Sequence, residues 1–177
     1  IRPEDEFTAS DNLIAQKKAK ILKQQADKMT LNKSFEKAKE LYKESLVESP
    51  HDVDVYYNLG KVYSKTGDYD NAIKAYKKII EITPKDVEVL TLLGENYNKS
   101  GNNEEALKYF KMAVDIDPKY DQAQRQRKET ENLMLEKVMP FYAREKKKKQ
   151  AEENLVKALN IVMQKAPADL ADNLYGI

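Results

Sequence analysis

A 34-residue repeat is the feature that most constrains the fold of this 177-residue chain. Prolines and glycines recur at this spacing, and so do small and aromatic residues. The recurring positions are Pro50, Pro84 and Pro118; Gly60 and Gly94; Gly67 and Gly101; Ala38, Ala72 and Ala106; and Tyr42, Tyr76 and Phe110. A fixed period of this length is typical of stacked structural repeats. It divides residues 19–120 into three units.

Each unit is predicted to contain two helices. In the second unit, apolar and aromatic residues recur every three or four positions over 53–65 and again over 70–82, which places them on one helical face. Gly67 suits the turn between these helices, because glycine readily adopts the left-handed conformation that ends a helix. Gly60 lies inside a predicted helix, where glycine costs about 1 kcal/mol relative to alanine. We therefore expect another helix to approach closely at this position.

On these residues the chain resembles the tetratricopeptide repeat (TPR) family. The residues that carry the resemblance are Tyr56, Leu59, Gly60, Tyr63, Ala72, Tyr76 and Pro84 in the second unit, and Leu90, Leu93, Gly94, Tyr97, Ala106, Phe110, Ala113 and Pro118 in the third. The first unit departs from the pattern, with Lys33 in place of the turn glycine and Ser45 in place of a small alanine. The resemblance implies an all-α, right-handed TPR solenoid of helix-turn-helix repeats with a longer C-terminal helical region.

The period also sets the expected domain boundaries. We expect a lead-in at 1–11, a first repeat with an extended first helix at 12–52, a second repeat at 53–86, a third at 87–120, C-terminal helices at 121–166, and an apolar tail at 167–177. Ser10 and Asp11 are suited to cap the first helix. Pro140 is expected to interrupt the C-terminal region, which then forms a capping element or a degenerate, elongated fourth hairpin. The alternative is one long, kinked helix.

The composition argues against several kinds of chemistry. The chain has no cysteine and one histidine, His51, which is expected to be a loop residue rather than a metal ligand or a catalytic base. Acidic residues such as Asp68 and Asp70 fall at predicted helix starts, where the helix dipole explains them. We therefore predict that the protein is not an enzyme and has no cofactor, no metal and no small-molecule substrate.

The TPR resemblance implies a concave groove lined by the first helix of each repeat, which binds a peptide or a partner helix. The groove residues expected from the period are Lys23, Asp27, Asp54, Tyr57, Asn58, Lys61, Glu88, Thr91, Glu95, Asn98, Gln122 and Arg125. Their amide side chains can bond to an extended peptide backbone. The predicted function is thus a protein–protein interaction scaffold or adaptor.

One subtype of TPR domain is disfavoured. TPR domains that hold the C-terminal carboxylate of a chaperone use Lys or Asn, Asn, and Lys or Arg at set positions. Here these positions hold Lys23, Asp27, Asn58, Glu88 and Leu92, of which two match. Glu88 would repel a carboxylate.

Two alternative functions rest on the C-terminal region. Leu155, Leu159, Val162 and Met163 form one apolar stripe, which suggests a self-assembling scaffold that forms a homo-oligomer. The basic run at 144–149 suggests a nucleic-acid or membrane-surface binder. With 31 Lys and Arg against 30 Asp and Glu, however, a chain-wide nucleic-acid footprint is disfavoured. The sequence begins with Ile1, so a cytoplasmic protein and one exported after removal of an N-terminal segment are both compatible with it, and no compartment is predicted.

Overall fold

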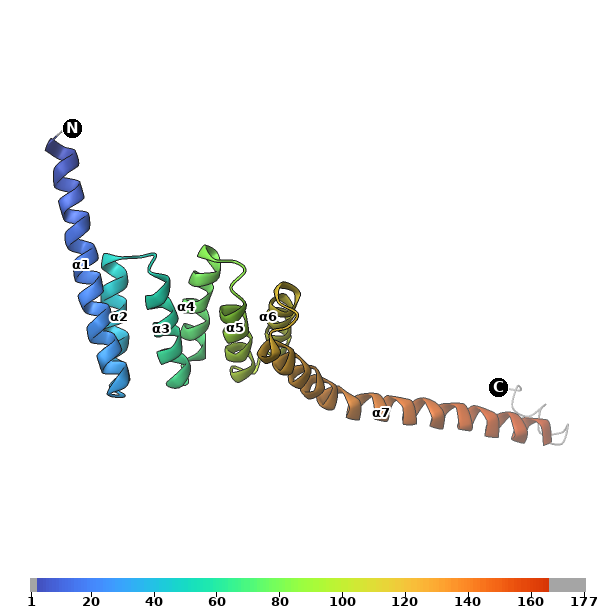
Figure 1. Ribbon diagram of the computed structural model, residues 1–177. Helices are drawn as coiled ribbons and strands as arrows, with labels where there is room; N and C mark the ends of the chain where they lie inside the picture. Colours follow the sequence, from blue (N-terminus) through green and yellow to red (C-terminus); the bar gives the residue numbers. More distant parts are fainter. Residues whose placement is uncertain (1–2, 166–177) are drawn as a thin grey trace, which may run out of the picture. The chain divides into compact units, whose positions relative to one another are not determined.

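The regular structure of the described residues is entirely helical (Figure 1). The computed structural model describes the backbone of residues 3–165 and the side chains of residues 10–164. Its helices are α1 (Pro3–Leu31), α2 (Phe35–Glu48), α3 (Val53–Lys65), α4 (Tyr69–Ile82), α5 (Val87–Lys99), α6 (Asn103–Ile116) and α7 (Asp121–Lys165). No described helix has an apolar stretch long enough to cross a membrane.

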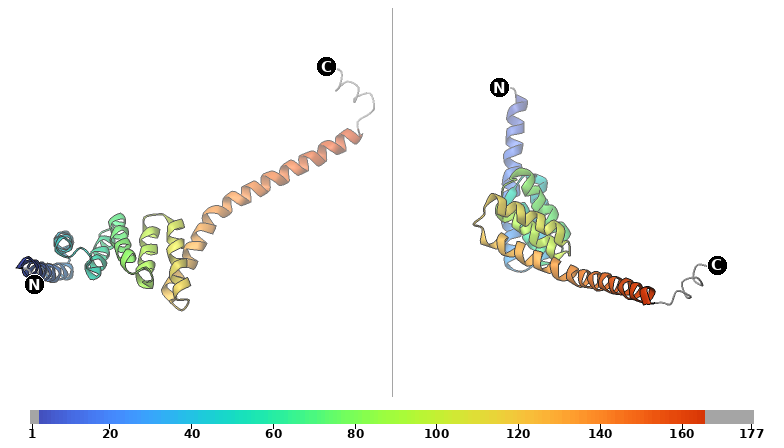
Figure 2. Two further views of the ribbon diagram at one scale, coloured as in Figure 1. Left: turned by 90° about the horizontal axis from the view of Figure 1, so that it is seen from above. Right: turned by 90° about the vertical axis from the view of Figure 1, so that its right-hand side faces the viewer.

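Helices α1 to α6 form three hairpins that pack in series (Figures 1 and 2). Helix α1 packs on α2, α3 on α4 and α5 on α6, while α2 contacts α3 and α4 contacts α5 to join successive hairpins. Residues 121–131 of α7 belong to this same compact unit, whereas residues after 131 form a second one. The predicted all-α repeat solenoid is therefore confirmed for the repeat unit.

Each hairpin is closed by a small residue on its first helix and an aromatic ring on its second. A Cβ added to Gly60 would lie 2.7 Å from Cε1 of Tyr76, and one added to Gly94 would collide with the ring of Phe110. Ala26 has the corresponding place in the first hairpin and is fully buried. The expected close approach is thus confirmed, and its cause is an aromatic side chain of the same repeat.

The hairpin turns and helix starts follow from local chemistry. The side chains of Asp52, Asp68, Asp86 and Asn102 each accept a hydrogen bond from a backbone N–H in the first turn of the following helix, at 3.0–3.3 Å. Gly67 and Gly101 have φ values of +81° and +86°, as the turn between two helices requires. Lys33 is the equivalent residue of the first repeat. It has a left-handed φ of +59° although it is not a glycine.

Both ends of the described chain differ from expectation. Helix α1 begins at Pro3, so Ser10 and Asp11 lie inside it, and over residues 3–11 the chain is helical rather than the predicted lead-in. Proline suits the first position of a helix, because its missing N–H would have no partner there.

Helix α7 is continuous from Asp121 to Lys165 with Pro140 inside it, so residues 121–165 form the single long helix that was the alternative, and the predicted hairpin is wrong. A proline inside a helix costs about 3 kcal/mol, and α7 accommodates Pro140 without ending there. The predicted apolar tail at 167–177 lies outside the described residues.

The left-handed backbone at Lys33 gives a first prediction. A side chain in this conformation costs roughly 1–2 kcal/mol, so Lys33→Gly should raise the free energy of unfolding by about 1 kcal/mol. Urea unfolding followed by circular dichroism measures the change.

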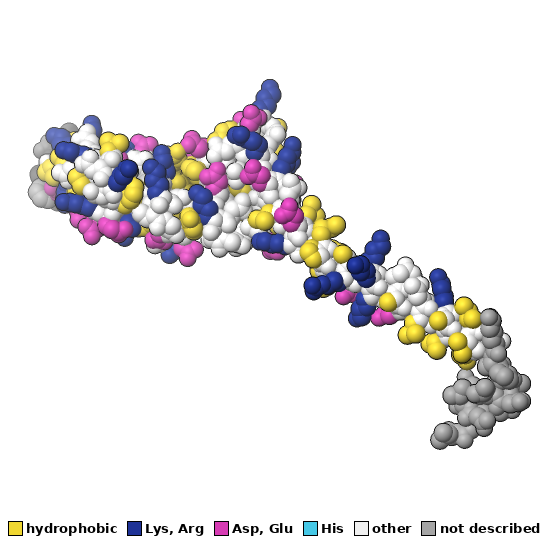
Figure 3. Space-filling view, turned by 90° about the horizontal axis from the view of Figure 1, so that it is seen from below, with side chains coloured by type: hydrophobic (Ala, Val, Ile, Leu, Met, Phe, Trp, Pro, Cys, Tyr) yellow, Lys and Arg dark blue, Asp and Glu magenta, His cyan; other side chains and the backbone are white. Residues whose placement is uncertain are grey.

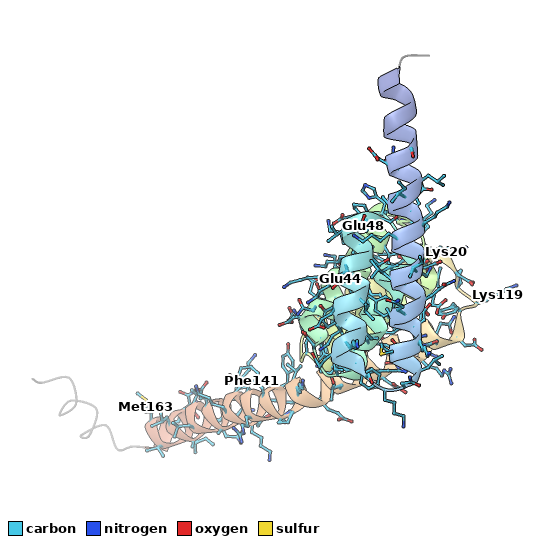
Figure 4. All side chains as sticks on the ribbon, turned by 90° about the vertical axis from the view of Figure 1, so that its left-hand side faces the viewer. Lys20, Glu44, Glu48, Lys119, Phe141 and Met163 are labelled. Atoms are coloured by element: carbon cyan, nitrogen blue, oxygen red, sulfur yellow. The ribbon has the colours of Figure 1, made fainter. Side chains whose placement is uncertain are left out.

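Lys20 is the matched control, because it is exposed inside α1 (Figure 4). Lys20→Gly should lower stability by about 1 kcal/mol. A loss of stability in both variants would contradict the role assigned to the Lys33 turn.

Candidate functional site

The predicted groove residues lie on the first helix of each repeat, namely α1, α3 and α5, and on the first residues of α7. We call their shared surface the first-helix face. The structure shows that most of these side chains contact one another between neighbouring helices, rather than standing apart.

Asp27 is the acceptor at the centre of the first contact. Its Oδ1 accepts a hydrogen bond from the Tyr42 hydroxyl at 2.6 Å and another from Nδ2 of Asn58 at 3.1 Å. Tyr42 is almost fully buried. Burial, and secondarily the bond to Asp27, raises the pKa of the Tyr42 hydroxyl to about 12. One carboxylate thus links α1, α2 and α3.

Lys23 forms the second contact between α1 and α3. Its Nζ lies 2.7 Å from Oδ2 of Asp54 and 3.8 Å from Oδ1 of Asp52. Because the Asp54 side chain is largely exposed, this ion pair contributes little to stability.

Tyr57 connects α3 to α5. Its hydroxyl donates a hydrogen bond to Oε1 of Glu88, and its ring meets the ring of Tyr76 edge-on at a centroid distance of 6.4 Å. Nζ of Lys61 lies 5.2 Å from the centre of the Tyr57 ring, within the range of a cation–π contact. Burial, and secondarily the bond to Glu88, raises the pKa of the Tyr57 hydroxyl to about 12.

The last contacts join α5 to the start of α7. Gln122 donates from Nε2 to Oε1 of Glu95 at 2.8 Å, and Asn98 donates from Nδ2 to Oγ1 of Thr130 at 2.7 Å. The Oδ1 atom of Asn98 is buried and accepts no hydrogen bond from any described residue.

Thr91 does not contribute to the first-helix face, contrary to expectation. It is 1% exposed, and its hydroxyl donates to the Val87 carbonyl of its own helix at 2.8 Å. Its short side chain points into the packing between helices, so a partner cannot reach it. Arg125, by contrast, is exposed, and no ion pair is found for it among the described residues.

Sequence reasoning identified the surface but missed how its residues pair. The pairs Lys23–Asp54, Asp27–Asn58 and Tyr57–Glu88 each span 31 positions, three fewer than the repeat. Residues at this separation fall one helical turn apart on neighbouring first helices. A search for complementary polar residues at this separation would have found the three pairs.

A hollow opens beside the Asp27 contact. It has a volume of about 300 Å³ and is lined by Asp27, Thr30, Leu31, Tyr42, Asn58, Lys61, Val62 and Lys65. Its lining combines aliphatic walls with amide, carboxylate and ammonium groups, so it can accept a small polar side chain. On the face of the repeats that Figure 3 shows, basic and acidic side chains are interspersed.

His51 is exposed in the loop between α2 and α3. Among the side chains of residues 10–164, no group of three or more histidines and acidic residues is arranged to hold a metal ion.

Comparisons with known proteins agree on the kind of repeat. The tetratricopeptide repeat family model matches residues 53–86 and 87–120. Among solved structures, the first TPR of Spaghetti (RPAP3) bound to the HSP90 peptide SRMEEVD is 15% identical, with a TM-score of 0.62 over 67% of this chain and 94% of that one. The Sgt2 TPR domain from Aspergillus fumigatus is 19% identical, with a TM-score of 0.61 over 68% of this chain and 82% of that one.

A crystal structure of MamA has a higher identity, 29%, with a TM-score of 0.54. The match covers 59% of this chain and 57% of that one, so the chain spans little more than half of MamA's length. No curated protein sequence matches the chain.

The shared carboxylate of Asp27 gives a second prediction. Asp27→Ala leaves the buried Tyr42 hydroxyl and the Asn58 amide without this acceptor, so it should lower the free energy of unfolding by about 1–3 kcal/mol. Asp54→Ala removes an exposed ion pair and should cost less than about 1 kcal/mol. Chemical unfolding of both variants measures the difference, and equal losses would show that Asp27 has no special structural role.

Proposed function

We propose that this chain, a member of the tetratricopeptide repeat family, is a non-catalytic scaffold that binds a peptide or partner helix along its first-helix face. The observation that carries the proposal is the set of polar contacts between successive first helices. These contacts fix the side chains of the face before a partner arrives, which lowers the entropy that binding must overcome.

The charged groups of the first-helix face that are left for a partner are cationic. Asp27, Asp54 and Glu88 are engaged by Tyr42, Lys23 and Tyr57. Lys61 and Arg125 are exposed, and neither forms an ion pair with a described residue. We therefore propose that the partner segment presents an acidic side chain to Lys61, beside the hollow that Lys61 helps to line.

The arrangement does not favour a chaperone C-terminal tail as the partner. Asp27 and Glu88 stand at positions where a carboxylate-binding TPR domain needs neutral or basic groups, and both are held in place by hydrogen bonds. The HSP90 peptide is bound by the TPR domain of RPAP3, which is 15% identical to this chain, a likeness that shows the fold alone.

Site-specific photo-cross-linking tests the proposal. A photoreactive amino acid in place of Lys65, which is exposed and lines the same hollow as Lys61, should give a discrete adduct in cells, and mass spectrometry should place the adduct on a short acidic segment of one partner. The matched control is Lys74, an exposed lysine on the second helix α4, where no such adduct is expected.

Binding of the cross-linked segment, made as a synthetic peptide, then gives the energetic test. Lys61→Glu should weaken its Kd about tenfold, equivalent to about 1.4 kcal/mol, while Lys74→Glu should leave it unchanged. Equal cross-linking at both positions, or equal affinity of both variants, would reject the first-helix face as the binding site.

A further inference from the structure

The part of α7 after residue 131 exposes many large apolar side chains. Among them are Leu135, Val138, Met139, Phe141, Tyr142, Leu155, Val156, Leu159, Val162 and Met163, each more than 40% exposed. Figure 3 shows hydrophobic side chains gathered along this segment with lysines between them, and Phe141 and Met163 extend from the helix in Figure 4. An exposed apolar face of this length indicates an interaction surface.

The apolar residues follow a seven-residue repeat over 135–163. Alternating steps of three and four along the helix give positions a and d of a heptad. Position a is occupied by Leu135, Tyr142, Lys149, Val156 and Met163, and position d by Val138, Glu145, Glu152 and Leu159. Pro140 falls at the outward position f, so any irregularity that it causes lies away from this seam.

The centre of the seam differs from its ends. Both ends are apolar, whereas the centre holds Glu145, Lys149 and Glu152. In a parallel pair of copies, each of these charges would face the identical charge of the other copy. In an antiparallel pair, position a faces position d, and opposite charges can meet.

One antiparallel register gives every seam position from Leu135 to Leu159 a partner in the second copy. When Lys149 faces Glu145 of the second copy, Leu135 faces Leu159 and Val138 faces Val156, since each pair of residue numbers has the same sum. Tyr142 then faces Glu152, whose carboxylate can accept a hydrogen bond from the tyrosine hydroxyl. The four aliphatic side chains that would be covered are between 41% and 58% exposed in the single chain.

The positions that flank the seam agree with this register. At position g the same antiparallel arrangement places Phe141 beside Leu155 of the second copy, and Met134 beside Val162. The outer positions b and c are mainly charged or small, including Glu136, Lys137 and Arg144. Most of the apolar surface therefore lies on the side that a second copy would cover, with Ile161 at the outward position f as an exception.

We propose that residues 133–163 of α7 pair with the same segment of a second copy as an antiparallel coiled coil, with Lys149 facing Glu145 at its centre. This surface is separate from the first-helix face, so the proposal does not depend on the proposed function. The central charges cost stability, but they select one register and one direction.

The main rival occupant is an anionic membrane surface. Residues 132–165 carry eight Lys and Arg and four Glu, a net charge of +4. A helix that lies in a membrane interface keeps its apolar face continuous and its charges on the other face. Here Glu145 and Glu152 lie on the apolar seam and would face anionic headgroups, so the charge pattern fits a second copy better.

Charge reversal in the full chain tests the central pair. Analytical ultracentrifugation over a concentration series should show a monomer–dimer equilibrium. Glu145→Lys and Lys149→Glu should each weaken the dimer by at least about tenfold, because each puts two like charges in contact. The double variant, which restores opposite charges, should regain most of the lost affinity.

The matched control is Lys147→Glu, the same change of charge at the outward position f, which should leave the dimer unchanged. All these side chains are exposed on α7, so circular dichroism and the thermal unfolding of the repeats should be unaltered. A chain that stays monomeric, or a loss as large in Lys147→Glu as in Lys149→Glu, would overturn the proposal. Binding to vesicles that contain anionic lipid without self-association would assign the helix to a membrane instead.

Cysteine cross-linking tests the direction, since the chain has no cysteine of its own. A mixture of Val138→Cys and Val156→Cys chains should form a disulfide between the two variants on oxidation. Val138→Cys alone should not, because its two thiols would lie about 27 Å apart in the antiparallel pair. Efficient cross-linking of Val138→Cys to itself would show a parallel pair and overturn the register.

Discussion

The contact on which the rest of the repeat unit depends is that of a small residue against an aromatic ring. The ring of Tyr76 lies so close to Gly60 that no Cβ would fit at this position. The ring of Phe110 excludes a Cβ at Gly94 in the same way. A larger residue would have to push the two helices of a hairpin apart. The first hairpin has Ala26 at the equivalent position, where it is fully buried, so all three hairpins have a small residue there.

The packing of successive hairpins brings their first helices close enough for the polar contacts of the first-helix face. The side chain of Asn58 reaches Asp27, and that of Tyr57 reaches Glu88, over the same separation of 31 positions. The contacts differ in energetic weight. Asp27 accepts a hydrogen bond from the buried Tyr42 hydroxyl and so contributes to the free energy of unfolding. The ion pair of Lys23 and Asp54 is exposed to solvent and chiefly sets the electrostatic character of the face.

The two proposed surfaces have different physical origins. The first-helix face is polar and preorganised, so it suits a ligand that is recognised by hydrogen bonds and charge. The seam of α7 is apolar at its ends and charged at its centre, so it suits a second helix of the same sequence. A dimer formed through α7 would carry two repeat units, and a partner with two copies of the recognised segment would gain avidity from it.

The sequence by itself determined the repeat, the helix class and which residues share the first-helix face. These follow from a period of 34 and from the requirements of single residues, such as the left-handed φ of Gly67 and Gly101. Local chemistry of this kind depends on neighbours in the chain, so it can be predicted from the order of residues.

Only the tertiary structure decided which side chains of the first-helix face are buried or bonded to a neighbouring helix. Thr91 is buried, Asp27 is shared by Tyr42 and Asn58, and Lys61 lies over Tyr57. The same holds for Pro140, which the sequence suggested as a break and which α7 accommodates within one helix. The surroundings of a proline in space decide whether it ends a helix or only strains it. They also decide whether a polar side chain contacts solvent or another helix. The spacing of residues along the chain does not contain this information.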